Sequence, residues 1–183
     1  MQILRFLSVA ALAALLCISS YGLAAEKTVT VGTALIGQNR GHPYQAITMP
    51  AVMVLLAVYD TLTVIDEDGS AGPGLAVSWE SDDAETWRFK LREGVAFSNG
   101  VPFTSDAIVR SVRHMREAPD AGTWTISTTL YQVASARAID ALTVEIKLSQ
   151  RDALFPLHAS VWRIAEPEAW ETLSKHEYES SPV

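Results

Sequence analysis

Four histidines are the residues of this chain whose side chains could bind a metal ion: His42, His114, His158 and His176. A metal site in a protein usually takes at least two of its ligands at short spacing on one element. No pair of these histidines has such a spacing, and His114 follows Arg113 on the polar side of a predicted helix. The sequence therefore predicts no metal site and no bound cofactor.

Hydroxyl and carboxylate groups are the other side chains that could do chemistry. The hydroxyls are those of Ser98, Thr104, Ser105 and Ser111, and the carboxylates are those of Glu80, Asp82, Asp83 and Glu85. The serines belong to no Gly-x-Ser-x-Gly elbow and no Ser-x-x-Lys motif. The carboxylates fall in a predicted turn, where water solvates them. We therefore expect no enzyme. The alternative, a small secreted hydrolase, predicts a turnover that replacing His114 and His158 abolishes.

The elements that position these groups are clearest over residues 85–115. Trp87, Phe89 and Leu91 alternate with basic residues, which is the period-two pattern of a strand with one apolar face. Gly94 interrupts this strand, and the Ser-Asn-Gly sequence at 98–100 is typical of a tight turn. The segment is predicted to be a strand, a bulge and a turn.

A helix is predicted after Pro102. Thr104 can cap it by accepting a hydrogen bond from a free backbone amide, and Asp106 lies where the helix dipole favours a carboxylate. Apolar residues recur at helical spacing as Ile108, Val112 and Met115. These three side chains are predicted to face the core.

A second amphipathic strand is predicted over residues 142–148, as the antiparallel partner of the Trp87 strand. Asp140 and Ala141 are expected to close its hairpin with residues 133–139.

Residues 49–62 are apolar on nearly every side and have Pro50 near their start, so we predict a buried helix there. A membrane span is the alternative, but the apolar run is short for one.

The remaining elements are predicted from shorter signals. Strands are expected at 26–33 and 62–65, a turn at 66–69, loops at 37–41, 72–74 and 118–122, and a short helix from Pro167. The next element after the loop at 72–74 is expected to begin with residues 75–79. Residues 125–134 fit either a strand or a helix, and the spacing of Ile126, Leu130 and Val133 favours the helix.

The N-terminus has the pattern of a secretory signal peptide. Arg5 precedes an apolar run over residues 6–18, and small residues suited to cleavage follow at 22–25. A retained membrane anchor is the alternative. The only cysteine, Cys17, lies inside the apolar run after Leu16, so a lipid-anchored protein is not expected and the mature chain has no thiol.

The charge of the chain limits its partners. The 183 residues carry a formal net charge of −7, and removal of Arg5 with the signal leaves 13 basic against 21 acidic residues. Nucleic-acid binding depends on clustered basic residues. No nucleic-acid partner is expected.

Residues 75–107 resemble the extracytoplasmic solute-binding proteins of family 5, which are the oligopeptide, dipeptide and nickel receptors of ABC importers. The family pattern is present as Leu75, Trp79, the acidic turn 81–83, Trp87, Phe89, Leu91-Arg92, Gly94-Val95, Phe97, Gly100, Pro102-Phe103-Thr104 and Asp106-Ala107. The Phe-Ser-Asn-Gly version of the turn is most similar to the nickel-type branch.

The resemblance implies an α+β fold, the N-terminal portion of a class II periplasmic-binding-protein-like fold, mainly its inserted subdomain with antiparallel strands and flanking helices. The implied organisation is a signal peptide at 1–25, the first strand and loop of lobe I at 26–45, the inserted subdomain at 46–179 and the start of the return to lobe I at 180–183. In the family a Gly-Thr-Gly-Pro motif and a second lobe follow. We therefore expect a truncated chain that is incomplete relative to the family.

The resemblance implies that Trp124 and Arg163 face the ligand cleft. An aromatic face beside a guanidinium suits a ligand with a carboxylate or a metal chelate. The alternatives are that Trp124 packs in the core and that Arg163 lies at the surface. A stripe of three arginines on the predicted helix is expected to be a solvated face: Arg110, Arg113 and Arg116. The alternative is a docking patch for the importer.

The implied function is that of the periplasmic substrate-binding component of an ABC importer for peptides or chelated nickel, working with permease subunits in the inner membrane. A truncated chain is expected to bind no ligand by itself. The alternative is a stand-alone periplasmic interaction module, whose core would resist limited proteolysis.

Overall fold

The structure is a computed structural model of the 183-residue chain. It describes Thr30 and residues 41–45, 48–118, 126, 129 and 132–172. The chain divides into two compact units, Met1–Gly32 and Thr33–Val183, and every described residue except Thr30 belongs to the second. The predicted signal segment and, apart from Thr30, the predicted strand at 26–33 lie outside the described residues.

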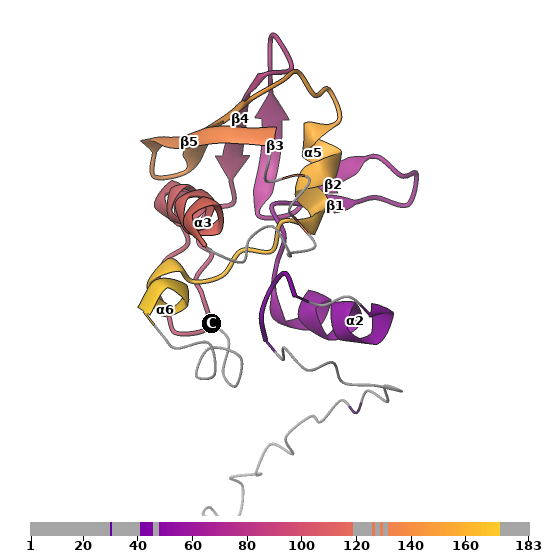
Figure 1. Ribbon diagram of the computed structural model, residues 1–183, viewed down its shortest axis with the longest axis vertical. Helices are drawn as coiled ribbons and strands as arrows, with labels where there is room; N and C mark the ends of the chain where they lie inside the picture. The colour runs from indigo at the N-terminus through magenta and orange to yellow at the C-terminus, as the bar shows by residue number, and fades with distance from the viewer. Residues whose placement is uncertain are drawn as a thin grey trace, which may run out of the picture. The chain divides into compact units, whose positions relative to one another are not determined.

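Helices and antiparallel strands alternate along the second unit, as Figure 1 shows. In chain order they are α2 (Met49–Val58), β1 (Thr63–Ile65), β2 (Ala71–Pro73), β3 (Ala76–Glu80), β4 (Thr86–Leu91), α3 (Ser105–Glu117), β5 (Val133–Asp140), β6 (Thr143–Leu148), α5 (Phe155–His158), the 3-10 turn η3 (Ala159–Val161) and α6 (Pro167–Thr172). The α+β class is confirmed.

A four-stranded antiparallel sheet in the order β3-β4-β6-β5 forms the centre of this unit. Trp87 of β4 lies opposite Ile146 of β6, and Phe89 lies opposite Val144. The predicted pairing of these two strands is confirmed, and so is the hairpin that Asp140 helps to close, because β5 pairs with β6. Local alternation was a sufficient signal here because each strand has one buried face.

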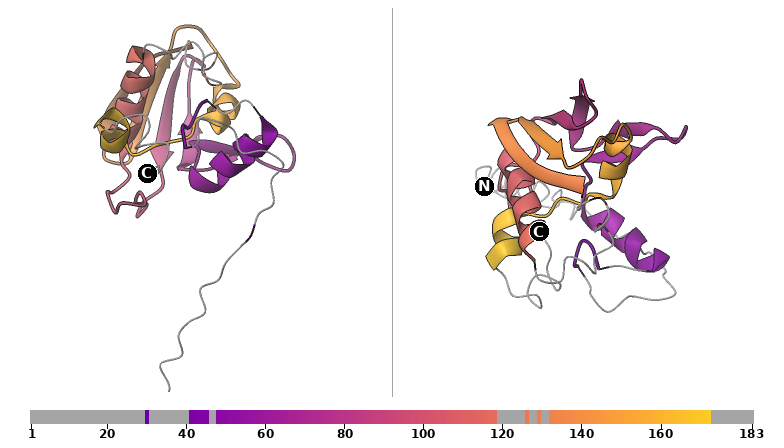
Figure 2. Two further views of the ribbon diagram at one scale, coloured as in Figure 1. Left: turned by 60° about the horizontal axis from the view of Figure 1, so that its bottom comes forward. Right: turned by 45° about the horizontal axis from the view of Figure 1, so that its top comes forward.

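One face of the sheet is buried and the other is charged. The apolar side chains of β4 and β6 are buried, and Ile108, Val112 and Met115 of α3 belong to the same core. Figure 2 shows α3 lying along the strands, and its packing against β5 and β6 agrees with this view. Burial of each large apolar side chain stabilises a fold by roughly 1.5–3 kcal/mol.

The outer face carries a row of alternating charges in register across the four strands. Arg88 lies opposite Glu80 on one side and Glu145 on the other, and Arg137 lies opposite the same Glu145. The ion pairs are 3.8 Å for Arg88 with Glu80, 3.4 Å for Arg88 with Glu145 and 2.9 Å for Arg137 with Glu145. Cross-strand pairs of opposite charge suit a face that water covers.

The turn before α3 is confirmed, but the predicted capping role of Thr104 is wrong. Gly100 has a φ of +86°, as the turn requires. Thr104 is at the N-cap position, yet its side chain makes no capping hydrogen bond. Ser105 anchors the helix instead, since its amide donates to the carbonyl of Ala141 at 2.9 Å and its hydroxyl donates to that of Asp140.

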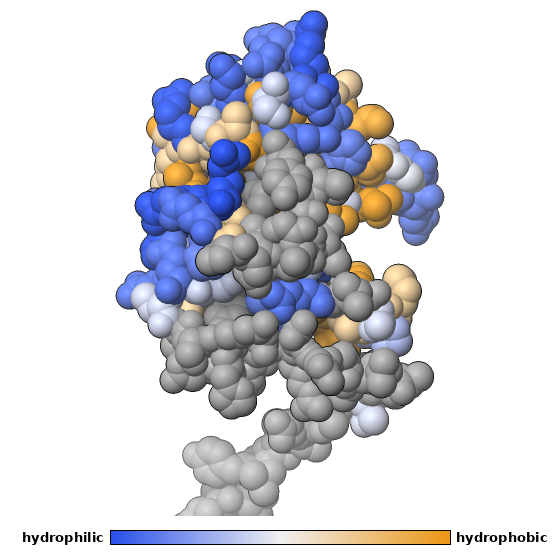
Figure 3. Space-filling model, in the orientation of Figure 1, coloured by the Kyte–Doolittle hydropathy of each residue, from blue (hydrophilic) through white to orange (hydrophobic). Residues whose placement is uncertain are grey.

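Helix α2 forms where the sequence predicts it, with proline in its first turn, but the expectation that it is buried is wrong. Leu55 is its one buried residue. Five of its large apolar side chains are exposed: Met49, Met53, Val54, Leu56 and Val58. Figure 3 shows hydrophobic residues at the surface where α2 lies, whereas the surface over the sheet and α3 is mainly hydrophilic. A single stripe of the helix packs, and hydrophobicity alone could not show which.

No helix among the described residues is long and apolar enough to cross a membrane.

The prediction of a loop at residues 72–74 is wrong for Gly72 and Pro73, because Ala71–Pro73 forms β2 and pairs with β1, whereas Gly74 lies outside the strands. Proline is tolerated since the ribbon has two strands and therefore free edges. A Cβ on Gly74 would lie 2.6 Å from the carbonyl oxygen of Thr61. Glycine is needed there for a close approach between two backbones, and not for a loop.

Most of the ambiguous stretch 125–134 lies outside the described residues. Thr129 and Gln132 are helical, as the favoured prediction has them, whereas Val133 and Ala134 belong to β5, so the helix is wrong for these last two residues. The predicted short helix at Pro167 is confirmed as α6.

Candidate functional site

Of the two predicted ligand contacts, Arg163 is described and Trp124 lies outside the described residues. Arg163 follows η3 on a short extended stretch that pairs with the residues after α2. The amide of Leu62 donates to the carbonyl of Trp162 at 3.1 Å, and the amide of Ile164 donates to that of Asp60 at 3.0 Å. This pairing, with Thr61 opposite Arg163, fixes the backbone from which the guanidinium extends.

Arg163 is buried, so its predicted alternative as a surface arginine is wrong. The exposed fraction of the whole residue is 6%. Nη1 donates to the carbonyl of Pro43 at 2.9 Å, while Nε is buried without a hydrogen-bond partner. No carboxylate among the described residues forms an ion pair with this guanidinium.

Burial lowers the pKa of Arg163, and the neighbouring phenols of Tyr44 and Tyr59 act in the opposite direction. A guanidinium keeps its proton in proteins, so the group remains a cation. A buried cation is costly unless it is paired. The arrangement therefore leaves a positive charge and a free N–H that an anion could satisfy.

Tyr44 was not predicted as a site residue, and the structure places it against Arg163. It is fully buried, and its hydroxyl donates to the carbonyl of Arg163. The hydroxyl of Tyr59 donates in the same way to the carbonyl of Gly41. Residues 41–45 are thus held against the strand pair that carries Arg163. The only sequence signal for Tyr44 is that it is an aromatic residue in the Gly-His-Pro-Tyr segment 41–44. This signal does not predict a contact with Arg163.

Aromatic rings surround this corner of the core. Trp170 of α6 lies 5.7 Å from Tyr44, 6.3 Å from His42 and 4.4 Å from His114, measured between ring centroids. His42 is buried, and its Nδ1 accepts from the amide of Tyr44 at 3.2 Å. Both histidines therefore act in packing.

Of the two remaining histidines, the structure describes only His158. His158 lies 2.7 Å from Asp152, a residue that also accepts from the amide of Leu154 at the start of α5. His176 lies outside the described residues. No group of three or more metal-binding side chains occurs in the described part of the chain.

The acidic turn has a structural role. Asp83 accepts from the amides of Thr86 at 2.7 Å and Glu85 at 2.8 Å, and these bonds lower its pKa.

The Ser111 hydroxyl is buried without a partner. No hydroxyl and histidine among the described residues are placed as a nucleophile and base would be, because Ser105 donates to a backbone carbonyl and His158 faces Asp152.

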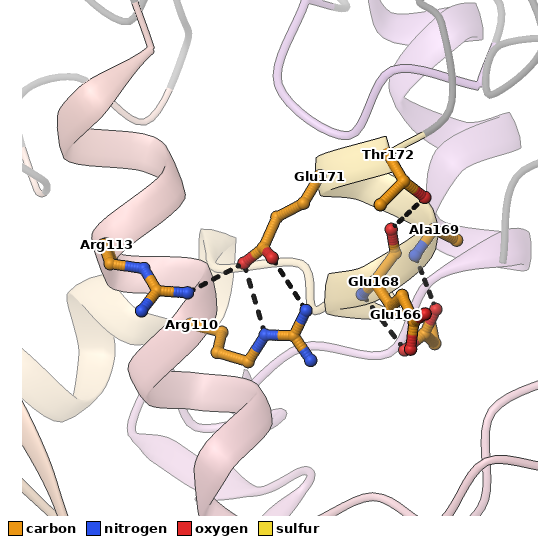
Figure 4. Close-up of polar contacts among 7 residues, drawn as sticks. All are labelled: Arg110, Arg113, Glu166, Glu168, Ala169, Glu171 and Thr172. Atoms are coloured by element: carbon orange, nitrogen blue, oxygen red, sulfur yellow. Dashed lines mark hydrogen bonds and ion pairs between the residues drawn. The ribbon is translucent and has the colours of Figure 1, made fainter.

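The arginine stripe of α3 is partly exposed to solvent, at Arg113 and Arg116, and it also makes contacts within the described residues. Figure 4 shows Arg110 and Arg113 pointing toward Glu171 of α6. Arg110 binds Glu171 at 2.7 Å and 3.3 Å, and Arg113 binds it at 3.3 Å. Arg116 donates to the carbonyl of Val133. The stripe ties α3 to α6 and β5.

Glu166 holds the start of α6. It is buried, and its carboxylate accepts from the amides of Ala169 at 2.7 Å and Glu168 at 3.2 Å (Figure 4). A carboxylate at a helix start satisfies free amides and suits the helix dipole. The residues that follow Arg163 are therefore fixed at both ends of the short link to α6.

The model of the bacterial extracellular solute-binding proteins, family 5 (middle), matches residues 70–181. The chain is 29% identical over 137 residues to the nickel-binding periplasmic protein of Escherichia coli K12, covering 74% of this chain and 25% of that protein. It is 35% identical over 69 residues to the periplasmic oligopeptide-binding protein OppA of the same organism, covering 38% of this chain and 13% of OppA. The chain thus spans at most about a quarter of these relatives.

A solved structure of a similar protein also resembles the fold of this chain. NikA from Brucella suis in complex with Fe(III)-EDTA superposes with a TM-score of 0.57 at 30% identity, over 69% of this chain and 26% of that one. The described residues therefore have the α+β, periplasmic-binding-protein-like fold, and they correspond to part of it. On the strength of the family match, this chain belongs to the bacterial extracellular solute-binding proteins of family 5.

Proposed function

We propose that this chain provides part of the periplasmic substrate-binding component of an ABC importer for peptides or chelated nickel, and that Arg163 contacts an anionic group of the ligand. The names of the relatives support the class of ligand. The observation that carries the site is the buried guanidinium that no described carboxylate neutralises. A ligand carboxylate would supply the missing charge and accept the free N–H.

Trp124 is proposed as the second contact, with its ring against the apolar part of the ligand. We further propose that residues 1–25 direct export and are removed, that residues 46–179 form the inserted subdomain, and that the intact receptor delivers its ligand to inner-membrane permease subunits. In that mechanism two lobes close around the ligand and no covalent step occurs.

The experiment for Arg163 requires the rest of a receptor, because the chain spans about a quarter of the nickel-binding relative. The matching segment of that protein is replaced by residues of this chain, and titration calorimetry measures binding of a nickel chelate with free carboxylates. Arg163→Met is expected to weaken binding by at least about 30-fold, since a charged hydrogen bond contributes roughly 2 kcal/mol.

Arg92→Met is the matched control, because this exposed arginine donates to the carbonyl of Gly74 alone among the described residues. Arg163→Lys should recover part of the affinity by restoring the charge. Circular dichroism of each chimaera shows whether it is folded. Equal affinities for Arg163→Met and Arg92→Met in folded chimaeras would refute the role of Arg163.

The chain by itself is proposed to bind neither peptides nor nickel chelates with useful affinity, since one lobe cannot close around a ligand. Titration of the purified 183-residue chain with a tripeptide and with the same chelate tests this directly. Micromolar binding of either one would contradict it.

A stand-alone periplasmic interaction module is the second candidate, and one observation favours it. Described residues from Tyr44 to Trp170 share a single buried core. Limited proteolysis separates the candidates: a module should leave a resistant fragment that contains β3 to β6, whereas rapid digestion within the sheet would remove this candidate.

A further inference from the structure

A hollow of about 230 Å³, lined by both apolar and polar groups, lies beside the end of α2, and Arg163 is not part of its lining. Its lining includes Val58, Tyr59, Asp60, Phe97, Phe103 and Ile164. Four segments contribute to this lining: the end of α2 with the two residues after it, the residue before β3, the turn before α3 and the stretch after η3.

The aromatic wall of the hollow is held in place by the turn that the family motif encodes. The amide of Phe97 donates to the carbonyl of Val101 at 2.9 Å, and the amide of Phe103 donates to that of Val95 at 2.9 Å. The two phenylalanine rings meet edge to face, with centroids 5.9 Å apart. A wall fixed in this way loses little freedom when a ligand packs against it.

The polar groups of the hollow favour a cation. Asp60 is its one charged lining residue, and none of the lining residues is basic. The backbone of Asp60 is fixed because its carbonyl accepts from the amide of Ile164 at 3.0 Å. Helix α2 ends next to Asp60 with no basic residue in its last turn, so the negative end of its dipole adds to the carboxylate charge.

We propose that this hollow binds a small organic cation, namely an ammonium group attached to one aromatic or branched aliphatic body. The body packs on Phe97, Phe103 and Ile164, and the ammonium group pairs with Asp60 at the rim. Aromatic faces attract cations as well, which adds to the same preference. The charge preference is opposite to that of Arg163, so this is a distinct site.

The test uses three probes of one shape and different charge: 2-phenylethylammonium, 2-phenylethanol and phenylacetate. Amide chemical shifts of the whole 183-residue chain are followed by NMR during each titration. The ammonium probe should bind with a Kd on the order of 1 mM, as a ligand of this size can reach, and should shift amides of residues 58–60, 95–103 and 164. The alcohol should bind more weakly and phenylacetate should not bind there.

Two variants locate the interaction. Asp60→Asn should weaken the ammonium probe about fivefold and leave the alcohol unchanged, since an exposed ion pair contributes up to about a factor of five. Phe97→Ala should weaken both probes. Asp82→Asn is the control, because Asp82 is an exposed carboxylate in the β3–β4 turn, outside the hollow.

Equal affinity for the ammonium and the alcohol, an equal effect of Asp60→Asn and Asp82→Asn, or shifts centred elsewhere would each overturn the proposal. The NMR spectrum of each variant shows directly whether it is folded. Arg163 takes no part in this test, so its result leaves the proposed function of Arg163 unaffected.

Discussion

Glu171→Gln is the most informative single change, because Glu171 holds two helices together across 58 to 61 residues of sequence. The amide keeps the shape of the carboxylate but removes its charge. Arg110 then loses a two-point charged contact, and Arg113 loses a longer one. The variant therefore isolates the charged contribution to α3–α6 packing.

The expected loss in the free energy of unfolding is about 1–2 kcal/mol. The side chains of Arg110 and Glu171 are 27% and 24% exposed, so their pair is partly shielded from water and contributes about 1–1.5 kcal/mol. Arg113 is 56% exposed, and an exposed pair adds a few tenths of a kcal/mol at most. For a chain of this size the melting temperature should fall by about 2–8 °C.

The pH dependence of this loss has a defined sign. The hydrogen bond and charge of Arg110 lower the pKa of Glu171, and the pKa of Arg110 is raised by the same bond. A carboxylate with a lowered pKa contributes its stability above its unfolded pKa, about 4.3, and loses it as the pH falls toward the folded value. The difference between the two proteins should be constant from pH 6 to 8 and shrink below about pH 4.

Urea unfolding followed by circular dichroism, at pH 7 and again at pH 3.5, measures both effects. Glu168→Gln on the same helix is the control, because Glu168 is exposed and its carboxylate makes no ion pair among the described residues. If Glu171→Gln and Glu168→Gln are equally stable at pH 7, or if the difference persists unchanged at pH 3.5, the ion pair does not hold the helices.

Three further changes test the core, a backbone contact and the outer sheet face. Phe89→Ala should cost about 3–5 kcal/mol in urea unfolding, because Phe89 is fully buried, and a loss below about 1 kcal/mol would contradict the packing of β4. Gly74→Ala should cost more than the roughly 0.5 kcal/mol of an ordinary surface substitution, because its Cβ would meet the Thr61 carbonyl at 2.6 Å; unchanged thermal stability would refute that contact. Glu145→Gln should make stability less dependent on salt, since it leaves Arg88 and Arg137 without their shared partner; an unchanged salt profile would show that the row of charges contributes nothing.

The strands of the sheet could be predicted because their information is local. Alternation at Trp87 to Leu91 and at Val144 to Leu148 identifies both the strands and their buried faces. Helix α3 could be predicted for the same reason. The signal there is the spacing of its apolar residues, which sets the face it presents to the sheet.

The errors arose where the answer depends on distant residues. The hydroxyl of Ser105 finds a carbonyl of the β5–β6 hairpin, so the prediction that Thr104 caps α3 with its side chain failed. In α2 every side chain is apolar, so the sequence contains no polar stripe to mark the exposed face. Gly72 and Pro73 usually mark a loop, and only the pairing with β1 reveals a strand.

The candidate site was predictable in part. Arg163 was identified by resemblance to family 5, but its burial depends on residues 41–45 and on the pairing with Thr61. The contact with Tyr44 joins residues 119 apart, and no local pattern reports it. The pairing of Arg110 with Glu171 escaped the sequence for the same reason.

The pairing of Thr61 with Arg163 also means that this part of the fold cannot form until residue 163 has been synthesised. A ribosome adds about 5–20 residues per second, so the chain between these two positions takes roughly 5–20 s to appear. The β3–β4 hairpin can form in microseconds within that interval, whereas Asp60 and Leu62 must wait for Ile164 and Trp162, which are not yet made. The nascent chain therefore has an interval in which it offers unsheltered apolar groups to a chaperone.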